Sequence, residues 1–420
     1  MLGHVYIVFD YSCNFFENKL SIFRNVLKKY EFFFLINYIL PQKTILITIL
    51  SLFLVTYIYT GFRLYKILPD FLFSRILLII LFVIGITGMV LFFSFGEKMS
   101  TSVSGSLYRF STSWIIAFLY FLIAVLLVDA FRLLNNIFHI IDKDIAVSIF
   151  RENLLTSIII FGSVALILVF GNIQYHNKKR QHVTILSNKI EKPVRIVGIS
   201  DLHIGYTISA KEVSKWVKLI NDEKPDIIII AGDIIDNHLR PVLEDSISNV
   251  LKKLDAPMGV YASTGNHDLM FAINEDVNFY KKSGITLLRD SFININGITI
   301  IGRDDYTNLK RSKLDNITQS VDMTSFTILL DHQPTKLNDA VKNGIDFQLS
   351  GHTHRGQVFP ISLITDTLFE LSHGYLKKGD THFYVSSGIG IWGGKFRIGT
   401  RSEYLVLDLE PSKDLIENEI

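Results

Sequence analysis

The first part of the chain is dominated by long stretches without charged residues. Four of them lack Asp, Glu, Lys and Arg, and they cover Thr44–Phe62, Ile76–Gly96, Phe110–Val128 and Leu154–Asn177. A helix needs about 20 apolar residues to cross the hydrocarbon core of a bilayer. A buried helix of a soluble protein is rarely apolar on every side for that length. The pattern therefore predicts an all-α region of about four transmembrane helices between residues 44 and 177, in a multi-pass protein of the cell membrane.

The segment before these helices, residues 1–43, is expected to be cytoplasmic or interfacial. It contains Asp10 and Glu17 and lacks the basic start and apolar run of a cleavable signal peptide. Basic residues are more numerous on the side of the termini, which favours a cytoplasmic C-terminal region. The other side has fewer basic residues, but they lie in short loops, where basic residues have the strongest influence on the orientation of a membrane protein. The sequence therefore leaves open which side of the membrane the C-terminal region faces.

The pattern changes after Asn177. Residues 178–193 are polar and basic, and we expect a juxtamembrane linker there. From 194 to 410, short β-rich runs alternate with amphipathic stretches such as Ser209–Asn221 and a helix around Glu275–Lys282. The run Asp226–Ala231 contains four consecutive isoleucines, which is typical of a strand buried on both faces. Residues 194–410 are thus predicted to form a layered α/β domain, followed by a tail over 411–420.

Composition agrees with a membrane protein. Hydrophobic residues make up 49% of the chain and charged residues 20%, below the roughly 25% of an average soluble protein. The single cysteine, Cys13, excludes a disulfide framework and a cysteine-based zinc site. With 42 basic against 40 acidic residues, no nucleic-acid partner is expected. No pattern points to a protein partner.

Polar side chains follow five of the predicted strands at the point where each strand ends. They are Asp201 and His203, Asp233, the run Asn266, His267 and Asp268, then His332, and finally His352 and His354. We expect these strands to belong to one sheet, whose carboxyl edge is where open α/β sheets place ligand sites. Each short motif alone is typical of a turn or a solvated strand end. Their joint, ordered occurrence after apolar strands favours a site.

Carboxylates mixed with imidazoles suit Mn, Fe or Zn rather than calcium. Seven of these side chains are candidate metal ligands: Asp201, His203, Asp233, Asn266, His332, His352 and His354. A single first-row ion usually takes four to six donors, so seven are more than one ion needs. Two divalent ions sharing a carboxylate would use them all, and such a pair can clamp a phosphate for in-line displacement.

This set of motifs resembles the calcineurin-like metallophosphoesterase superfamily, from about Val194 to Leu409. The segments Ile199–His203, Leu330–Pro334 and Gly356–Pro360 are similar to its bacterial membrane-anchored branch. The resemblance implies a four-layer sandwich, with two mixed β-sheets packed face to face and flanked by helices. It also implies that the domain hydrolyses phosphoric esters with divalent metal ions.

The resemblance further implies a role for each residue. Asp201, His203 and His354 would hold one ion, and Asn266, His332 and His352 the other. Asp233 would bridge the two ions. His267 would contact the phosphate and protonate the leaving group, a step that needs an acid tuned near neutral pH, and Asp268 would orient its imidazole.

Two arginines are candidate substrate-binding residues. Arg355 stands where the membrane-anchored branch often has glycine, and it could grip a second phosphate or a lipid head group. The alternative for Arg355 is a solvated loop residue. Arg397, near the C-terminal strands, is a second candidate.

The function expected from these observations is hydrolysis of a phosphodiester or pyrophosphate bond by direct attack of a metal-bridging hydroxide. Because a membrane anchor raises the local concentration of substrates near the bilayer, membrane lipids are expected partners and a lipid-linked phosphoester the expected substrate. One alternative is a non-catalytic membrane sensor or scaffold that binds metal or nucleotide. A filled set of ligand positions argues against it. A transporter is disfavoured because the spans lack ionisable residues at mid-depth.

Overall fold

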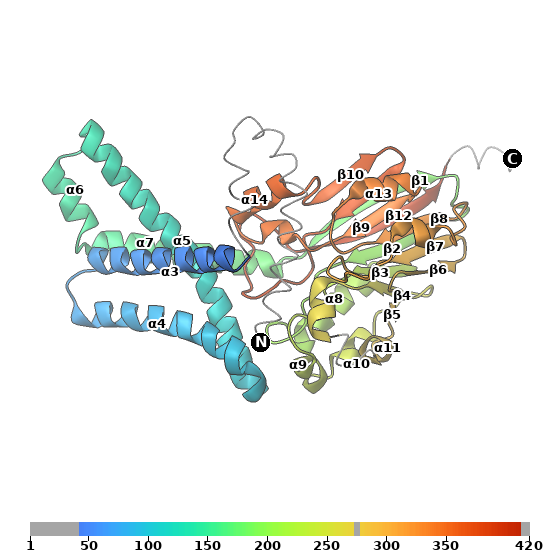
Figure 1. Ribbon diagram of the computed structural model, residues 1–420, viewed down its shortest axis with the longest axis horizontal. Coiled ribbons are helices and arrows are strands. Elements are labelled where there is room, and N and C mark those ends of the chain that lie inside the picture. The colour runs from blue at the N-terminus through green and yellow to red at the C-terminus, as the bar shows by residue number, and fades with distance from the viewer. Residues whose placement is uncertain (1–41, 273–277, 413–420) are drawn as a thin grey trace. The chain divides into compact units, whose positions relative to one another are not determined.

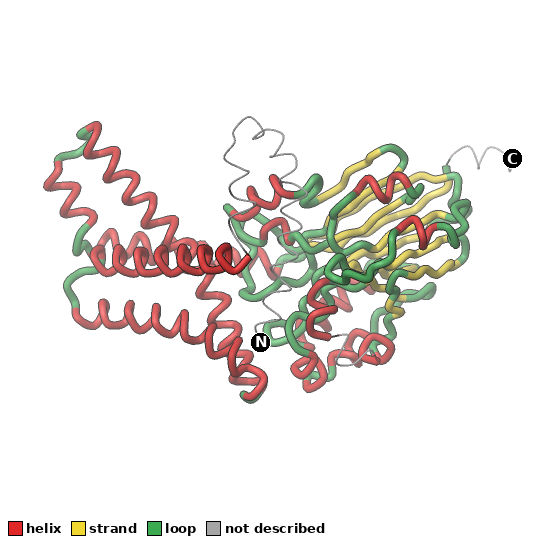
Figure 2. Tube along the Cα trace, viewed as in Figure 1, coloured by secondary structure: helices red, strands yellow, loops and turns green. Residues whose placement is uncertain are grey.

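The computed structural model describes residues 42–272 and 278–412. The chain divides into two compact units. Among the described residues, a helical unit comprises Gln42–Val90 and Trp114–Ile167, and an α/β unit comprises Leu91–Ser113 and the residues from Leu168 onward. Figure 2 shows all strands in the α/β unit. Most of the segment expected at 1–43, part of the helix expected around 275–282 and most of the 411–420 tail lie outside the described residues.

Each of the four predicted spans coincides with a long apolar helix, and only Gly96 and Asn177, at the ends of two spans, lie just outside. These helices are α3 (Gln42–Ile67), α4 (Leu72–Phe95), α5 (Thr101–Phe138) and α7 (Leu154–His176), and each is long and apolar enough to cross a membrane. Helices α3 and α5 extend past the uncharged stretches at both ends, and α4 at its start, because a charged residue ends an apolar stretch without ending a helix. A short helix, α6 (Lys143–Phe150), connects α5 to α7, and its N-cap Asp142 accepts a hydrogen bond from the Asp144 backbone.

Aromatic side chains join three of these helices within the helical unit. Trp114 on α5 donates its indole N–H to the hydroxyl of Tyr57 on α3 at 2.9 Å. Tyr57 in turn donates to the carbonyl of Phe82 on α4 at 2.5 Å. Gly85 is required beside them, since a Cβ there would lie 2.1 Å from the Trp114 ring. Small residues of this kind let apolar helices approach closely where lipid supplies no hydrophobic driving force.

The α/β unit contains two mixed six-stranded sheets (Figure 1). The first has the order β1-β12-β2-β3-β4-β5, and the second β10-β11-β9-β8-β7-β6. The strands are β1 (Lys179–Ser187), β2 (Val194–Ile199), β3 (Ile227–Ala231), β4 (Val260–Ser263), β5 (Thr286–Leu287), β6 (Ser291–Ile295), β7 (Ile298–Gly302), β8 (Phe326–Leu330), β9 (Phe347–Ser350), β10 (Gly374–Lys378), β11 (Thr381–Val385) and β12 (Glu403–Pro411).

The four isoleucines of β3 show how the layers form. Ile227 and Ile229 join a core shared with Ile328 of β8, so the two sheets pack face to face. Ile228 and Ile230 point to the opposite face, into a core with the helices that cover the first sheet. Successive strand residues point to opposite faces, so a strand buried on both sides needs an unbroken apolar run.

Helices cover the outer face of each sheet. The first sheet packs against α8 (Ala210–Asn221), α9 (Leu239–Glu244), α10 (Ile247–Leu251) and α11 (Asn278–Lys282). The second packs against α12 (Leu314–Thr318) and α13 (Leu337–Lys342), and α14 (Ile361–Leu368) follows β9. The α/β/β/α sandwich expected from the sequence is confirmed, with apolar helices preceding it.

The expected linker at 178–193 is wrong. Residues Lys179–Ser187 form strand β1, which pairs in parallel with β12 from Lys179 opposite Glu403 to Ser187 opposite Pro411. Val183 and Ile185 face the core between the sheets, while polar neighbours alternate on the outer side. The strand was missed because its polar and basic residues occupy the exposed side of an edge strand.

Candidate metal centre

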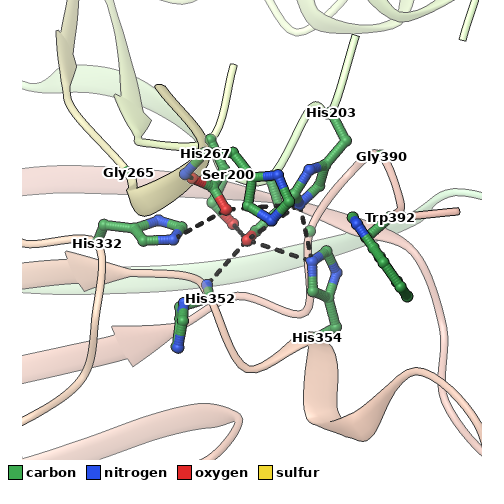
Figure 3. A network of polar contacts seen from close by, with 12 residues as sticks. Ser200, His203, Gly265, His267, His332, His352, His354, Gly390 and Trp392 are labelled. Atoms are coloured by element: carbon green, nitrogen blue, oxygen red, sulfur yellow. Dashed lines mark hydrogen bonds and ion pairs between the residues drawn. The ribbon is translucent and has the colours of Figure 1, made fainter. Parts of the chain in front are cut away.

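The candidate ligands converge from two sheets rather than from one. Asp201, Asp233 and Asn266 follow β2, β3 and β4 of the first sheet, whereas His332 and His352 follow β8 and β9 of the second. The expectation of a single sheet is therefore wrong. Because the sheets pack face to face, both carboxyl edges reach the same place, and Figure 3 shows the imidazoles gathered there.

Asp201, His203 and His354 form one donor cluster. The Nε2 atoms of His203 and His354 are 3.0 Å apart, and Asp201 Oδ1 lies 3.9 Å from the first and 3.5 Å from the second. Ligand atoms about 2.0–2.1 Å from a shared tetrahedral ion would be about 3.3 Å apart. The spacing of these three atoms therefore fits a common metal ion.

Asp233, His332 and His352 form a second cluster, with ligand atoms within 4.8 Å of one another. His332 Nε2 lies 3.2 Å from Asp233 Oδ2, and Asn266 Oδ1 lies 2.9 Å from His352 Nδ1. The same Asp233 oxygen is 3.6 Å from His203 Nε2 in the first cluster. Asp233 thus stands between the two clusters, where a bridging carboxylate belongs.

The backbone around the site adopts a conformation that most residues avoid. Positive φ angles between 46° and 69° occur at Asp201, His203, Asp233, His352 and His354. Such angles are uncommon outside glycine, although Asp and His tolerate them better than most, and each costs on the order of 1–3 kcal/mol. Strain concentrated on five candidate ligands is typical of a site built for function.

Gly265 allows two of the loops to touch. A Cβ at this position would lie 2.1 Å from Asp233 Oδ1 and 2.4 Å from the Asp233 backbone nitrogen. The loop after β4 can therefore reach the loop after β3 only with glycine here. This contact brings the His267 backbone N–H to Asp233 Oδ1 at 2.8 Å.

The electrostatics favour cation binding. Burial and the neighbouring His332 lower the pKa of His352 to about 3, and burial and His203 hold the pKa of His354 well below its usual value. Although burial opposes it, His332 and His267 hold the pKa of Asp233 well below the ordinary range. The neutral imidazoles of His352 and His354 are the forms that bind metal ions. His332 differs, because, although burial opposes it, Asp233 raises its pKa well above the usual value, so metal binding there would release a proton.

The carboxylate beside His267 is that of Asp236, not the expected Asp268. Asp236 Oδ1 lies 3.3 Å from His267 Nδ1 and 3.4 Å from His203 Nδ1. Asp268 instead accepts hydrogen bonds from three backbone N–H groups and from the Tyr280 hydroxyl. Asp268 therefore ties the strand-end loops together, while Asp236 faces the imidazoles.

The His267 imidazole is held as a cation. Burial opposes its charge, but Asp233 and Asp236 raise the pKa of His267 to about 9. Its Nδ1 also lies 2.8 Å from the Asp236 backbone oxygen. The Asp236 backbone oxygen therefore fixes the Nδ1 side of this ring.

Arg397 does not have the surface position expected of a substrate-binding residue. Its side chain is fully buried and donates to the His354 carbonyl at 2.8 Å and to the Gly390 carbonyl at 3.0 Å. It thus supports the loop that carries His354. Arg355 is half-buried on that same loop with a φ of 50°, and it remains a candidate for contact with substrate.

Three supporting residues were missed by the sequence reasoning. Asp236 has a weak signal, because it follows Asp233 by three positions in the same loop. Ser200 donates to Asp201 Oδ2 at 2.5 Å and could be inferred only from its place beside a ligand. Tyr108 donates to Asp236 at 2.8 Å from 128 positions away, and no local pattern indicates such a contact.

Comparison with known proteins identifies the domain. A family model described as calcineurin-like phosphoesterase matches residues 194–356. A metallophosphoesterase of Helicobacter pylori strain J99 is 32% identical over 239 residues, covering 56% of this chain and 64% of the relative. The chain therefore spans less than two thirds of that relative's length.

Two further relatives add to this. Metallophosphoesterase Cj0846 of Campylobacter jejuni is 30% identical over 257 residues, which cover 60% of this chain and 68% of that protein. A transmembrane protein with a metallophosphoesterase domain from Danio rerio is 28% identical over 286 residues, covering 62% of this chain and 63% of the relative. The motifs, the sandwich and these similarities lead to one conclusion: the chain belongs to the calcineurin-like phosphoesterase family.

Proposed function

We propose that this protein is a membrane-anchored phosphoesterase that hydrolyses a phosphodiester or pyrophosphate bond with the help of two divalent metal ions. The observation that carries the proposal is the position of Asp233, 3.2 Å from His332 in one donor cluster and 3.6 Å from His203 in the other. We further propose a multi-pass location in the cell membrane, supported by four helices able to span it.

Each cluster would hold one ion, which we propose to be Mn, Fe or Zn. Asp201, His203 and His354 would bind the first, and Asn266, His332 and His352 the second, with Asp233 bridging them. When bound, the ions would neutralise the charge of the phosphate and lower the pKa of water at the site. Asp201 is preorganised for this because it accepts a hydrogen bond from the His352 backbone N–H at 2.9 Å.

His267 is proposed to protonate the leaving oxygen. The Asp236 backbone oxygen holds the Nδ1 side of the ring at 2.8 Å, and, although burial opposes it, Asp233 and Asp236 raise the pKa of His267. A positioned general acid of this kind contributes about 10²–10⁴-fold to rate. The ring lies 4.7 Å, centroid to centroid, from that of the proposed ligand His203, and this short distance supports the proposed role.

We propose that the substrate is lipid-linked, with acyl chains that lie on the surface of α14. Phe359, Ile361, Leu363 and Ile364 are exposed there. The helix is followed by Phe369, whose ring lies 6.3 Å from that of His352. An exposed apolar surface beside a phosphate site suits a substrate with a charged head and an apolar tail.

The loop that carries Trp392 supports the same substrate class. Trp392 is exposed and is drawn with the site in Figure 3. Its loop is bonded to the end of α7, since Asn172 donates to the Lys395 carbonyl at 2.9 Å and Gly171 accepts from the Arg397 N–H at 2.9 Å. The exposed Trp392 thus belongs to a loop fixed to a helix that is able to span a membrane.

The test is hydrolysis of bis(p-nitrophenyl) phosphate and p-nitrophenyl phosphate by the detergent-purified protein, after chelation and re-addition of Mn, Zn or Fe. We expect metal-dependent cleavage of the diester by the wild-type protein. The rate of diester cleavage by Asp233→Asn should be more than about 100-fold lower, because the substitution weakens both proposed ion sites at once. Asp222→Asn, at an exposed carboxylate paired with Lys218, is the matched control and should keep full activity.

The outcomes separate the alternatives. Cleavage of the monoester alone would indicate that the protein is a phosphomonoesterase and not a phosphodiesterase. Binding of two metal ions without cleavage of either compound, with a cellular phenotype that survives Asp233→Asn, would contradict the enzyme and support a scaffold.

A further inference from the structure

The α/β unit includes a piece of the helices that precede it in sequence. Leu91–Ser113, comprising the end of α4, a short 3-10 turn and the start of α5, belongs to this unit. Helix α5 has 38 residues and is therefore about 57 Å long at 1.5 Å per residue. The hydrocarbon core of a bilayer is only about 30 Å thick. One helix can thus both cross a membrane and extend into the α/β unit.

The extension packs on the loop that carries two of the candidate metal ligands. Phe92, Tyr108 and Tyr206 form a buried aromatic cluster, in which the rings of Phe92 and Tyr108 lie 4.7 Å apart and those of Phe92 and Tyr206 5.5 Å apart. Arg109 donates to the Tyr206 carbonyl at 2.8 Å. Tyr206 lies three residues after His203, so the α4–α5 turn braces the loop after β2.

A hydrogen bond extends from this cluster to the centre of the site. The Tyr108 hydroxyl donates to Asp236 Oδ2 at 2.8 Å, and the Asn237 side chain donates to the same oxygen at 2.7 Å. Tyr108 is 1% exposed and Asp236 is fully buried. The other oxygen of Asp236 faces Nδ1 of both His203 and His267, at 3.4 and 3.3 Å.

We propose that Tyr108 is a positioning residue, through which helix α5 completes the active site of the domain that follows it. With Oδ2 held by Tyr108 and Asn237, Oδ1 of Asp236 is fixed between the two imidazoles. One of these, His203, is a proposed metal ligand, and the other, His267, is the proposed leaving-group acid. This inference rests on the proposed function, and its physical basis is the orientation that a partner of a ligand imposes on that ligand.

Removing the Tyr108 hydroxyl should act on both imidazoles. Asp236 would keep one donor on Oδ2 and could rotate. His203 Nδ1 would then lose the carboxylate oxygen that faces it, and His267 Nδ1 would be held by the Asp236 backbone oxygen alone. Changes to groups that orient metal ligands typically cost 10–100-fold in metal affinity or activity. We expect Tyr108→Phe to lower kcat about 10-fold with KM unchanged, and to weaken Mn²⁺ binding several-fold.

The experiment compares Tyr108→Phe with Tyr206→Phe in the full-length, detergent-purified protein. Tyr206→Phe removes a hydroxyl from the same aromatic cluster; that hydroxyl accepts from Arg240 at 3.2 Å. Measurements are kcat and KM for a series of aryl phosphodiesters with increasingly basic leaving groups, and Mn²⁺ affinity by calorimetry. Tyr108→Phe should lower kcat most for the most basic leaving groups, because these depend most on protonation by His267. Tyr206→Phe should have the kcat of the wild type.

A double-mutant cycle with Asp236→Asn adds a second test. If Tyr108 acts through Asp236, Tyr108→Phe should have little further effect in the Asp236→Asn background. The proposal is overturned if Tyr108→Phe keeps wild-type kcat and Mn²⁺ affinity. It is also overturned if Tyr108→Phe and Tyr206→Phe lose activity equally across all leaving groups, which indicates lost packing alone. Should the wild type hydrolyse none of the esters, the proposed function fails, while the Mn²⁺ measurements still decide whether Tyr108 positions His203.

Discussion

The Nε2 atoms of His203 and His354 face each other at 3.0 Å, from loops that follow strands in different sheets. Two imidazole nitrogens at this distance repel through their lone pairs unless a proton or another cation lies between them. Burial and His203 hold the pKa of His354 well below its usual value, so the ring is neutral, and a neutral pair can share one N–H···N hydrogen bond at this distance. A divalent ion is the natural partner for both nitrogens, and it would join the edges of the two sheets.

Metal removal should therefore lower the stability of the α/β unit. A ligand at 100 times its dissociation constant stabilises the state that binds it by about 2.7 kcal/mol. We expect chelation to lower Tm by several degrees and Mn²⁺ to restore it, as measured by thermal unfolding in detergent. In His354→Ala, which removes one of the facing nitrogens, Mn²⁺ should raise Tm by less than it does in the wild type. An equal increase in both proteins would contradict a shared ion at this position.

Arg397 should support the site without touching substrate. Its buried guanidinium donates to the carbonyls of His354, Ser387 and Gly390. Arg397→Gln would leave some of these acceptors without a donor, at a cost of about 1–3 kcal/mol for each buried group. Thermal unfolding should show lower stability, and Mn²⁺ titration lower affinity.

Arg401→Gln, at an exposed arginine four residues further on, is the control and should leave stability and Mn²⁺ affinity unchanged. If Arg397→Gln instead raised KM for the diester with metal binding and stability intact, a role in substrate binding would replace the supporting one.

The layered fold could be predicted because its determinants are local. The four isoleucines of β3 and the polar residues after five strands are visible in a single reading of the chain. Strand β1 was missed because an edge strand needs few apolar residues. Its partner β12 is also far from it in the sequence, at the C-terminal end of the domain. Asp236 and Tyr108 were missed for a related reason, since a contact across 128 positions leaves no periodic signal. The division of the ligands between two sheets likewise depends on pairing that sequence alone does not show.

Acid should destabilise the α/β unit through Glu403. This buried carboxylate accepts hydrogen bonds from Tyr384, Ser387 and Gln181 and lies 3.1 Å from His373 Nε2. Although burial opposes it, His373 and Ser387 lower the pKa of Glu403 below its ordinary value of 4.5. A depressed pKa contributes stability that is present above the unfolded-state value and is lost as pH falls below it.

The loss should therefore begin below about pH 4.5 and be weaker in Glu403→Gln, which should also be less stable at pH 7. Thermal unfolding across this pH range is the measurement. Glu410→Gln, at an exposed position on the same strand, should follow the wild-type curve. If the stability of Glu403→Gln fell with pH as much as that of the wild type, titrating groups other than Glu403 would cause the loss.

The surface of α14 should distinguish lipid phosphoesters from soluble ones. Replacing Leu363 and Ile364 together by serine removes two exposed apolar side chains. Each carries roughly 1.5–3 kcal/mol of burial free energy if an acyl chain covers it. Turnover of a lipid phosphodiester in mixed micelles should fall at least 10-fold, with bis(p-nitrophenyl) phosphate cleaved at the wild-type rate. The control is the pair Leu243→Ser and Leu309→Ser, which are exposed elsewhere in the unit. Equal losses on both substrates, or on neither, would rule out this surface as the acyl-chain site.

The order of strands in the first sheet also determines when the domain can form during synthesis. Strand β12 lies between β1 and β2, so two early strands stay apart until a strand made much later is inserted. Gln181 of β1 and Glu403 of β12, which are hydrogen bonded, are 222 positions apart. Contacts of this separation form slowly, and unpaired strand edges exposed in the meantime are prone to aggregate. The apolar helices leave the ribosome first, so the chain can be held at the membrane while the sheet still lacks its second strand. Anchoring would then keep incomplete domains apart from one another until β12 arrives.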